Sequence, residues 1–240
     1  MTEPAQLARE MAELYNEGNA LSKAGLLEQA VAAYDQVVEK SGPSDDQLLA
    51  NVVALALFNK AIALRDLGRT EDEIAAYDQL LMHVSGSTDP VRLHQAARAL
   101  LNKGLALSTL GREQEEIDVY QELSDRFSDS SDERTQREVA LGLVYQAVSV
   151  GHLRRYADEL PIYDRVIERY GGTSNTDINA AVAMALIKKA IVLGWLGRET
   201  EELAAYDEIL RRYRGAADER LAQIVQSAEE LQLRTEFEQA

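Results

Sequence analysis

The chain has 240 residues, 46% of them hydrophobic and 28% charged, and 41 acidic residues against 25 basic ones give it a formal net charge of −16. An acidic chain repels phosphate backbones and anionic lipids, which excludes nucleic acid and membrane surfaces as expected partners. The absence of cysteine excludes disulfides, thiolate nucleophiles and cysteine-based zinc sites. We also expect no membrane-spanning segment and no secretory signal, and therefore a cytoplasmic protein.

Internal repetition is the dominant feature of the sequence. Tyrosines recur every 43 residues, and leucines and small residues keep the same step. The tyrosines are Tyr34, Tyr77, Tyr120, Tyr163 and Tyr206. A sustained period of this length is typical of a stacked array in which each repeat buries its apolar face against its neighbours. It predicts one domain over residues 1–240, with five helix-pair repeats and a capping helix, over 3–45, 46–88, 89–131, 132–174, 175–217 and 218–235.

Local signals place two helices in each repeat. In the second repeat, residues 46–67 predict a long first helix and residues 71–84 a shorter amphipathic one, because their apolar residues recur at helical steps. A side chain able to cap the first helix recurs at Asp46, Asp89, Asp132, Asn175 and Asp218. Glycines suited to end this helix with a positive φ recur at Gly25, Gly68, Gly111 and Gly197.

The fourth repeat departs from this pattern at two positions. Arg154 stands where the other repeats have glycine, so the chain there either avoids a positive φ or accepts strain. Pro161 falls inside the second helix, where it removes a hydrogen bond and collides with the preceding turn. We predict that this helix begins late, near Leu160, or bends at the proline. We favour the bend, because Tyr163 keeps its phase and must still pack.

The segment YNEGNALSKAGLLEQAVAAYDQVV, residues 15–38, closely resembles a tetratricopeptide repeat in its small and aromatic residues. Residues 58–81 and 101–123 resemble it with changes, and the resemblance extends over nearly the whole chain. It implies an all-α, right-handed α-solenoid of stacked antiparallel helix pairs that binds proteins or peptides, without a cofactor. The family usually repeats about every 34 residues, so the chain resembles a bacterial-type array with an enlarged period of 43 residues. HEAT-like arrays are the structural alternative.

Two polar columns change together in repeats two to five. The first helices carry Lys60, Lys103, Gln146 and Lys189, and thirteen residues later come Glu73, Glu116, Glu159 and Glu202. In the resembling family these columns face each other across the helix pair. We therefore predict salt bridges within the repeats, with the arginine four residues before each glutamate as a second partner. The predicted pairs are Lys60–Glu73, Lys103–Glu116 and Lys189–Glu202. The alternative is two solvated faces that share a period.

The resemblance places a ligand groove on the first helices. The partner-binding residues that we predict in this groove are Tyr15, Asn16, Asn19, Phe58, Asn59, Arg98, Asn102, Tyr145, Lys188 and Trp195. Amide side chains there can pair with a peptide backbone. We expect the apolar residues of two neighbouring columns to select side chains. The first column holds Tyr15, Phe58, Leu101, Val144 and Ile187, and the second holds Asn19, Ile62, Leu105, Val148 and Ile191. The set Asn19, Asn59, Arg98 and Asn102 partly resembles the family's carboxylate clamp, although Tyr15 stands where the clamp needs lysine.

No phosphate-binding loop, zinc-type histidine spacing or nucleophile with its base is found in the sequence, so we expect no catalytic residue and no metal. We predict a protein or peptide interaction module whose acidic field favours a neutral or basic partner segment. Two alternatives remain open. One is a regulatory or targeting subunit of a bacterial signalling or defence enzyme, and the other is a structural element that self-associates.

Overall fold

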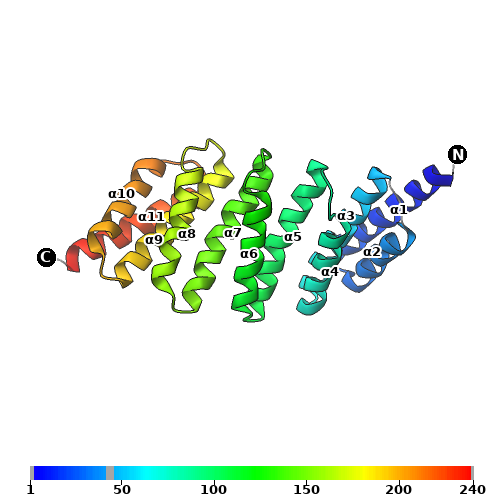
Figure 1. Ribbon diagram of the computed structural model, residues 1–240, viewed down its shortest axis with the longest axis horizontal. Helices are drawn as coiled ribbons and strands as arrows, with labels where there is room; N and C mark the ends of the chain where they lie inside the picture. The colour runs from blue at the N-terminus through cyan, green and yellow to red at the C-terminus, as the bar shows by residue number, and fades with distance from the viewer. Residues whose placement is uncertain (1–2, 42–45, 239–240) are drawn as a thin grey trace. The chain divides into compact units, whose positions relative to one another are not determined.

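The computed structural model describes residues 3–41 and 46–238, which fold into helices without strands (Figure 1). In chain order, these helices are α1 (Glu3–Lys23), α2 (Leu27–Ser41), α3 (Gln47–Asp66), α4 (Thr70–His83), α5 (Pro90–Thr109), α6 (Glu113–Phe127), α7 (Glu133–His152), α8 (Tyr156–Tyr170), α9 (Thr176–Trp195), α10 (Glu199–Tyr213) and α11 (Glu219–Glu238). Longer first helices alternate with shorter second helices, and α11 is the additional first helix that the repeat predicts. The all-α fold is confirmed.

The helices form two compact units, residues 1–115 and residues 116–240. In the N-terminal unit, α1 to α5 each pack against the next helix, and α3 also contacts α1 and α5 directly. In the C-terminal unit, α7 to α11 pack in the same order, and α9 also contacts α7 and α11. Helix α6 packs against α7 through Tyr120 and Tyr145, whose ring centroids are 6.0 Å apart. Each unit therefore has the α-solenoid arrangement, with antiparallel helix pairs stacked so that their first helices lie side by side.

Both ends of the first helices form as their residues predict. Free amides of the first turn donate to the capping side chains of Asp46, Asp89, Asp132 and Asn175. At the other end of α3, Gly68 has a φ of 73°. The next amide, of Arg69, donates to the carbonyl of Leu64 at 2.9 Å. This is the bond that closes a helix ended by a left-handed glycine.

The fourth repeat accepts strain at its turn but keeps its second helix. Arg154 has a φ of 59° and is the only residue other than glycine with a positive φ among those described. Helix α8 begins at Tyr156 and continues through Pro161, so the late start near Leu160 is wrong. Pro161 and Ala157 are both exposed, so water can hydrogen-bond the Ala157 carbonyl that the proline leaves without a donor.

The recurrent tyrosines form the centre of the packing. Tyr77 and Tyr120 are fully buried, and the other three are 1% exposed. Small residues are needed where these rings lie: a Cβ added at Gly18 would come within 2.6 Å of Tyr34 Cε1. The column of small residues therefore makes room for the tyrosine column.

Helices α3 and α9 are the most apolar of those described. By length and composition alone, both could cross a membrane, a result that the sequence pattern did not predict. In the structure, 50% of the most apolar window of α3 and 61% of that of α9 are buried against protein. Each of these helices lies among four neighbours, and a helix covered on most of its faces needs an apolar surface on most of its faces.

Candidate functional site

The predicted groove residues of the N-terminal unit form a hydrogen-bonded cluster. The Asn59 Nδ2 group donates to Asn19 Oδ1 at 2.8 Å and to the Tyr15 hydroxyl at 3.2 Å. The Tyr34 hydroxyl also donates to Asn19 Oδ1, at 2.8 Å. Asn16 is exposed on the same helix as Tyr15 and Asn19. The cluster joins α1, α2 and α3, so a peptide backbone would have to compete with these internal hydrogen bonds.

The residues that resemble a carboxylate clamp are held by other contacts. The Arg98 guanidinium carbon lies 3.9 Å from the centroid of the Phe58 ring, and its Nη1 donates to Gln95 Oε1 at 3.2 Å. Asn102 Nδ2 donates to the backbone carbonyl of Arg98 at 2.8 Å. Arg98 therefore covers Phe58, which is only 4% exposed.

Of the two columns expected to select partner side chains, the apolar residues of the first belong to the core. Leu101 and Val144 are 6% and 0% exposed. The column four residues further along each first helix is accessible: Leu105 is exposed, and Val148 and Ile191 are half-buried. Because one helical face carries both columns, the tertiary stacking decides which of them meets water.

The predicted lysine–glutamate ladder is wrong. The lysines reach back 25 residues to aspartates on the second helix of the preceding repeat. Their Nζ groups form the pairs Lys60–Asp35 at 2.6 Å, Lys103–Asp78 at 2.5 Å and Lys189–Asp164 at 2.5 Å. At the same position in two other first helices, a glutamine replaces the lysine. Gln146 Nε2 donates to Gln121 Oε1 at 2.9 Å, and Gln232 Nε2 donates to Asp207 Oδ1 at 2.7 Å. This column therefore joins successive repeats and does not lie within one repeat.

The glutamates of the predicted ladder are buried under the tyrosine column. The Tyr163 hydroxyl donates to Glu159 Oε2 at 3.0 Å, and Glu159 is 3% exposed. Burial raises the pKa of Glu73 to about 7, although Arg65 and Tyr77 oppose the shift. The arginines expected as second partners bind acids three residues later instead, at Arg69–Asp72, Arg112–Glu115, Arg155–Asp158 and Arg198–Glu201.

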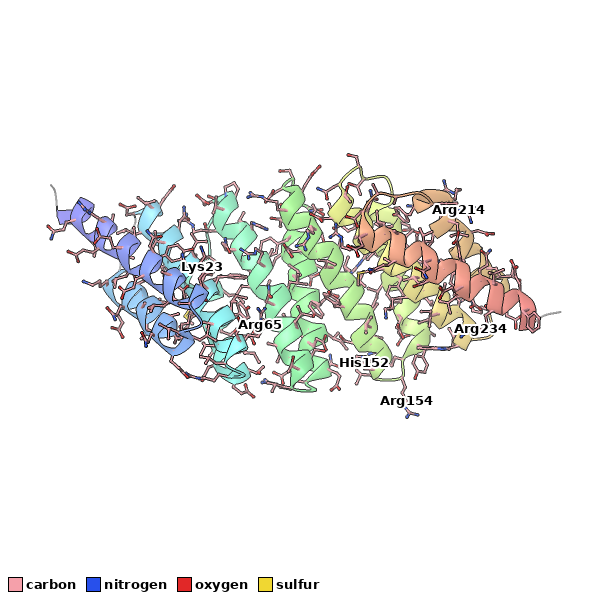
Figure 2. The ribbon with its side chains drawn as sticks, turned by 180° about the vertical axis from the view of Figure 1, so that it is seen from behind. Lys23, Arg65, His152, Arg154, Arg214 and Arg234 are labelled. Atoms are coloured by element: carbon pink, nitrogen blue, oxygen red, sulfur yellow. The ribbon has the colours of Figure 1, made fainter. Side chains whose placement is uncertain are left out.

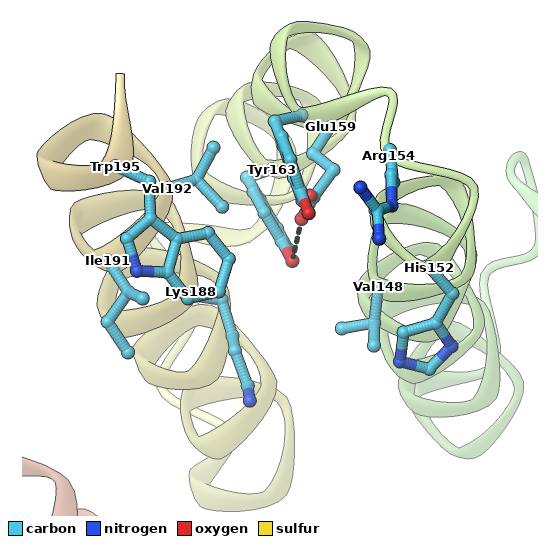
Figure 3. Close-up of a pocket in the computed structure, with 11 residues that line it drawn as sticks. Val148, His152, Arg154, Glu159, Tyr163, Lys188, Ile191, Val192 and Trp195 are labelled. Atoms are coloured by element: carbon cyan, nitrogen blue, oxygen red, sulfur yellow. Dashed lines mark hydrogen bonds between the residues drawn. The ribbon is translucent and has the colours of Figure 1, made fainter. Parts of the chain in front are cut away.

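A cavity of about 490 Å³ opens between α7, α8 and α9 of the C-terminal unit (Figure 3). Its lining residues are Val148, Gly151, His152, Arg154, Tyr156, Glu159, Tyr163, Lys188, Ile191, Val192 and Trp195. Figure 3 places His152 and Arg154 on one side and Lys188 with Trp195 on the other, with the hydrogen-bonded Glu159 and Tyr163 between them. The volume falls within the range of ligand pockets, about 300–1,000 Å³.

Aromatic side chains form the rim of the cavity. Trp195 is 68% exposed, and its ring and that of Tyr156 pack edge to face at a centroid distance of 5.7 Å. Trp195 and Ile191 also line a second cavity, of about 240 Å³, between α9, α10 and α11. The exposed indole of Trp195 therefore lies between these two cavities of the C-terminal unit.

The floor of the cavity depends on a glycine. A Cβ added at Gly151 would lie 2.1 Å from Glu159 Oε1. The equivalent residue of the second repeat, 86 residues earlier, is Arg65, whose charge acts on the buried Glu73. In the fourth repeat no side chain occupies this place, and the space above Glu159 is part of the cavity.

The comparison with protein families identifies part of the chain. Residues 15–90 match the family model described as a tetratricopeptide repeat. This segment is similar to tetratricopeptide repeats. The match runs from within α1 to the first residue of α5 and covers two of the three segments whose sequence resembles this family, residues 15–38 and 58–81. Tetratricopeptide repeats generally mediate protein–protein interactions as scaffolds and are typically not catalytic. No curated protein sequence matches the chain.

The tetratricopeptide pattern indicates Lys188 and Trp195 as groove residues but does not group them with His152, Arg154 and Glu159. Tyr145, the groove residue one turn before Val148, packs against Tyr120 and does not line the cavity. Arg154 in the glycine column is the signal that marks this repeat. Among the residues that the structure describes, no group of three His, Asp or Glu side chains is arranged to hold a metal ion.

Proposed function

We propose that this protein is a non-catalytic scaffold that captures a segment of a partner protein on the first helices of its C-terminal unit. The observation that carries the proposal is the exposed Trp195 between two cavities. Large aromatic side chains that fill pockets contribute most of the energy of many interfaces, at about 2 kcal/mol or more each. An indole that is 68% exposed in the free protein gains this energy only when a partner covers it.

The charge of the whole chain supports a particular kind of partner. At −16, the long-range field favours a segment that is neutral or basic overall, and it disfavours nucleic acid and anionic lipid. A cytoplasmic location, which the lack of cysteine favours, belongs to the same proposal. So does a role as a regulatory or targeting subunit, because such a subunit would use the same surface.

The test compares two surface variants in capture experiments from native lysate with quantitative mass spectrometry. Trp195→Ala should lose the partner at least about tenfold, because one hot-spot aromatic is worth 1.4 kcal/mol or more. Met82→Ala is the matched control, since Met82 is 74% exposed but belongs to α4 of the N-terminal unit. Equal capture by both variants, with unchanged helicity, would remove Trp195 from the interface.

A second candidate function is self-association, which an exposed apolar pair on α11 favours. Leu233 and Phe237 are 67% and 83% exposed, and they lie one helical turn apart. Light scattering over a range of protein concentrations would detect a dimer. Replacing both residues with glutamate should abolish it, because two charges at such an interface lose their hydration.

A further inference from the structure

We propose that the cavity between α7, α8 and α9 binds an acidic side chain of the partner segment, with an apolar side chain beside it against Trp195. This inference rests on the proposed function for its location and adds the chemistry of the bound segment. It concerns the turn of the fourth repeat and the last turns of α7 and α9, and not the asparagine column of the N-terminal unit.

The three basic residues at this cavity have no hydrogen-bond or ion-pair partner for their side chains among the described residues. In the part of the chain that the structure describes, the side chains of His152, Arg154 and Lys188 form no ion pair or hydrogen bond, and all three are exposed. Their sequence neighbours differ: Arg155 binds Asp158 at 2.8 Å and Lys189 binds Asp164 at 2.5 Å. Arg155 and Lys189 therefore have acidic partners within the chain, whereas Arg154 and Lys188 line the cavity and can bind an external anion.

The backbone holds one of these basic residues in place at a conformational cost. Arg154 has a φ of 59°, a region that glycine adopts without steric penalty and that the other repeats fill with glycine. The turn still closes, since the Arg155 amide donates to the Val150 carbonyl at 3.3 Å. Figure 2 shows Arg154 and His152 at the same edge of the C-terminal unit. Residues with a strained backbone are concentrated at binding sites, where the function of the side chain compensates for the conformational cost.

Glu159 is the acidic group at the floor of the cavity. Its burial favours the neutral carboxyl, which repels an anion less than the carboxylate does. The side chain is 3% exposed and accepts a hydrogen bond from Tyr163. Burial raises the pKa of its carboxyl, while the hydrogen bond from Tyr163 and the charges of His152 and Lys188 lower it. A bound anion would raise this pKa further, because a second negative charge favours the protonated form.

The ionisable groups around the cavity give a direction for the effect of pH. They are His152 and Arg154 after α7, Tyr156, Glu159 and Tyr163 from α8, and Lys188 from α9. Burial raises the pKa of the Glu159 carboxyl, so lowering the pH protonates this group and removes a negative charge that opposes an anion. A cationic ligand would show the opposite dependence. The sign of the pH effect therefore distinguishes the two classes of ligand.

The remaining wall fits an apolar neighbour of the acidic side chain. Trp195 and Tyr156 form an aromatic corner, and Val148, Ile191 and Val192 continue it. The net charge of −16 repels a strongly acidic segment as a whole. A neutral or basic segment with a single acidic residue avoids long-range repulsion by the acidic chain. Its one carboxylate can still bind the basic side chains of the cavity.

The test uses Trp195, the only tryptophan of the chain, as a fluorescent reporter. Three capped peptides in a neutral serine-rich host carry Asp-Leu, Asn-Leu or Lys-Leu at the centre. The Asp peptide should bind about tenfold or more tightly than the Asn peptide, because its carboxylate makes charge-assisted hydrogen bonds. Its binding should strengthen as the pH is lowered and weaken with salt. Equal affinity for the Asp and Asn peptides, or preference for the Lys peptide, overturns the inference.

Two variants locate the effect. Arg154→Gly restores the residue of the other repeats, and Lys188→Gln removes the opposite charge; each should reduce the preference for Asp over Asn, whereas Arg155→Gln should not. An unchanged preference in both cavity variants contradicts the inference. If Trp195→Ala still abolishes lysate capture while no peptide shows an acid preference, the acidic chemistry fails and the proposed function stands. If capture is also unchanged, both fail.

Discussion

Lys189 of α9 forms an ion pair with Asp164 of α8, with 2.5 Å between Nζ and Oδ1. The pair links the first helix of one repeat to the second helix of the repeat before it. The same 25-residue step joins Lys60 to Asp35 at 2.6 Å. Each lysine is therefore part of the contact between repeats, and the adjacent Lys188 is free to face the cavity.

A double-mutant cycle would measure this contact. In urea unfolding, Lys60→Gln and Asp35→Asn should show a coupling energy of about 0.5–1 kcal/mol, as for a partly exposed ion pair. The pair Lys60 and Glu73 should show almost none, because the lysine ammonium binds Asp35. A larger coupling energy of Lys60 with Glu73 than with Asp35 would support a salt bridge within the repeat and contradict this result.

The buried Glu73 should make stability depend on pH. Burial raises its pKa from 4.5 to about 7 in the folded protein. Between these values the folded state binds more protons than the unfolded state, so stability falls as the pH rises. We expect a loss of about 1–3 kcal/mol between pH 4.5 and pH 8 from this group, measured by urea unfolding.

Glu73→Gln should flatten this dependence, because glutamine cannot ionise. Glu39→Gln, at an exposed position of α2, is the control and should leave the slope as it is. If the unfolding free energy of Glu73→Gln depends on pH as steeply as that of the wild type, another group causes the dependence.

Relieving the strained turn should stabilise the protein. Arg154→Gly should raise the free energy of unfolding by about 1 kcal/mol, because glycine adopts a positive φ without steric cost. The opposite change, Gly68→Ala, should lower it by a similar amount of about 1 kcal/mol. Thermal unfolding followed by circular dichroism would check both, and a less stable Arg154→Gly protein would contradict the strain.

The proline of α8 and the equivalent alanine of α10 form a matched pair, 43 residues apart. Pro161→Ala should stabilise the protein by about 1–3 kcal/mol, because it restores a backbone hydrogen bond. Ala204→Pro should destabilise it by about 3 kcal/mol for the same reason. Both side chains are exposed, so packing changes little. No gain in unfolding free energy on removing Pro161 would mean that α8 has adapted to it.

Close packing around the small residues predicts a steric penalty. A Cβ at Gly142 would lie 2.6 Å from Leu123 Cδ2, so Gly142→Ala should cost about 1–3 kcal/mol. At Gly172 nothing lies within 4 Å of an added Cβ, and Gly172→Ala is the control. Chemical denaturation of the two variants would compare the costs, and equal stabilities would show that α6 and α7 can move apart.

The helices and their order follow from local signals in the sequence. Capping by Asp46 and helix ending at Gly68 are contacts within a few residues, so their signals survive in a single sequence. The 43-residue recurrence of Tyr34 and Tyr77 predicts the stacked helix pairs, because each repeat must bury the same face.

Which helix faces contact each other depends on how the repeats stack. A first helix lies between its own second helix and that of the preceding repeat, and spacing along the chain does not tell which one Lys60 will reach. The same competition buried Leu101 and left Leu105 exposed. The cavity at Trp195 needed three helices to be placed around Gly151 and Arg154, and no periodic pattern contains that combination. Local bonds are encoded near each residue, whereas contacts between repeats depend on how the helices stack.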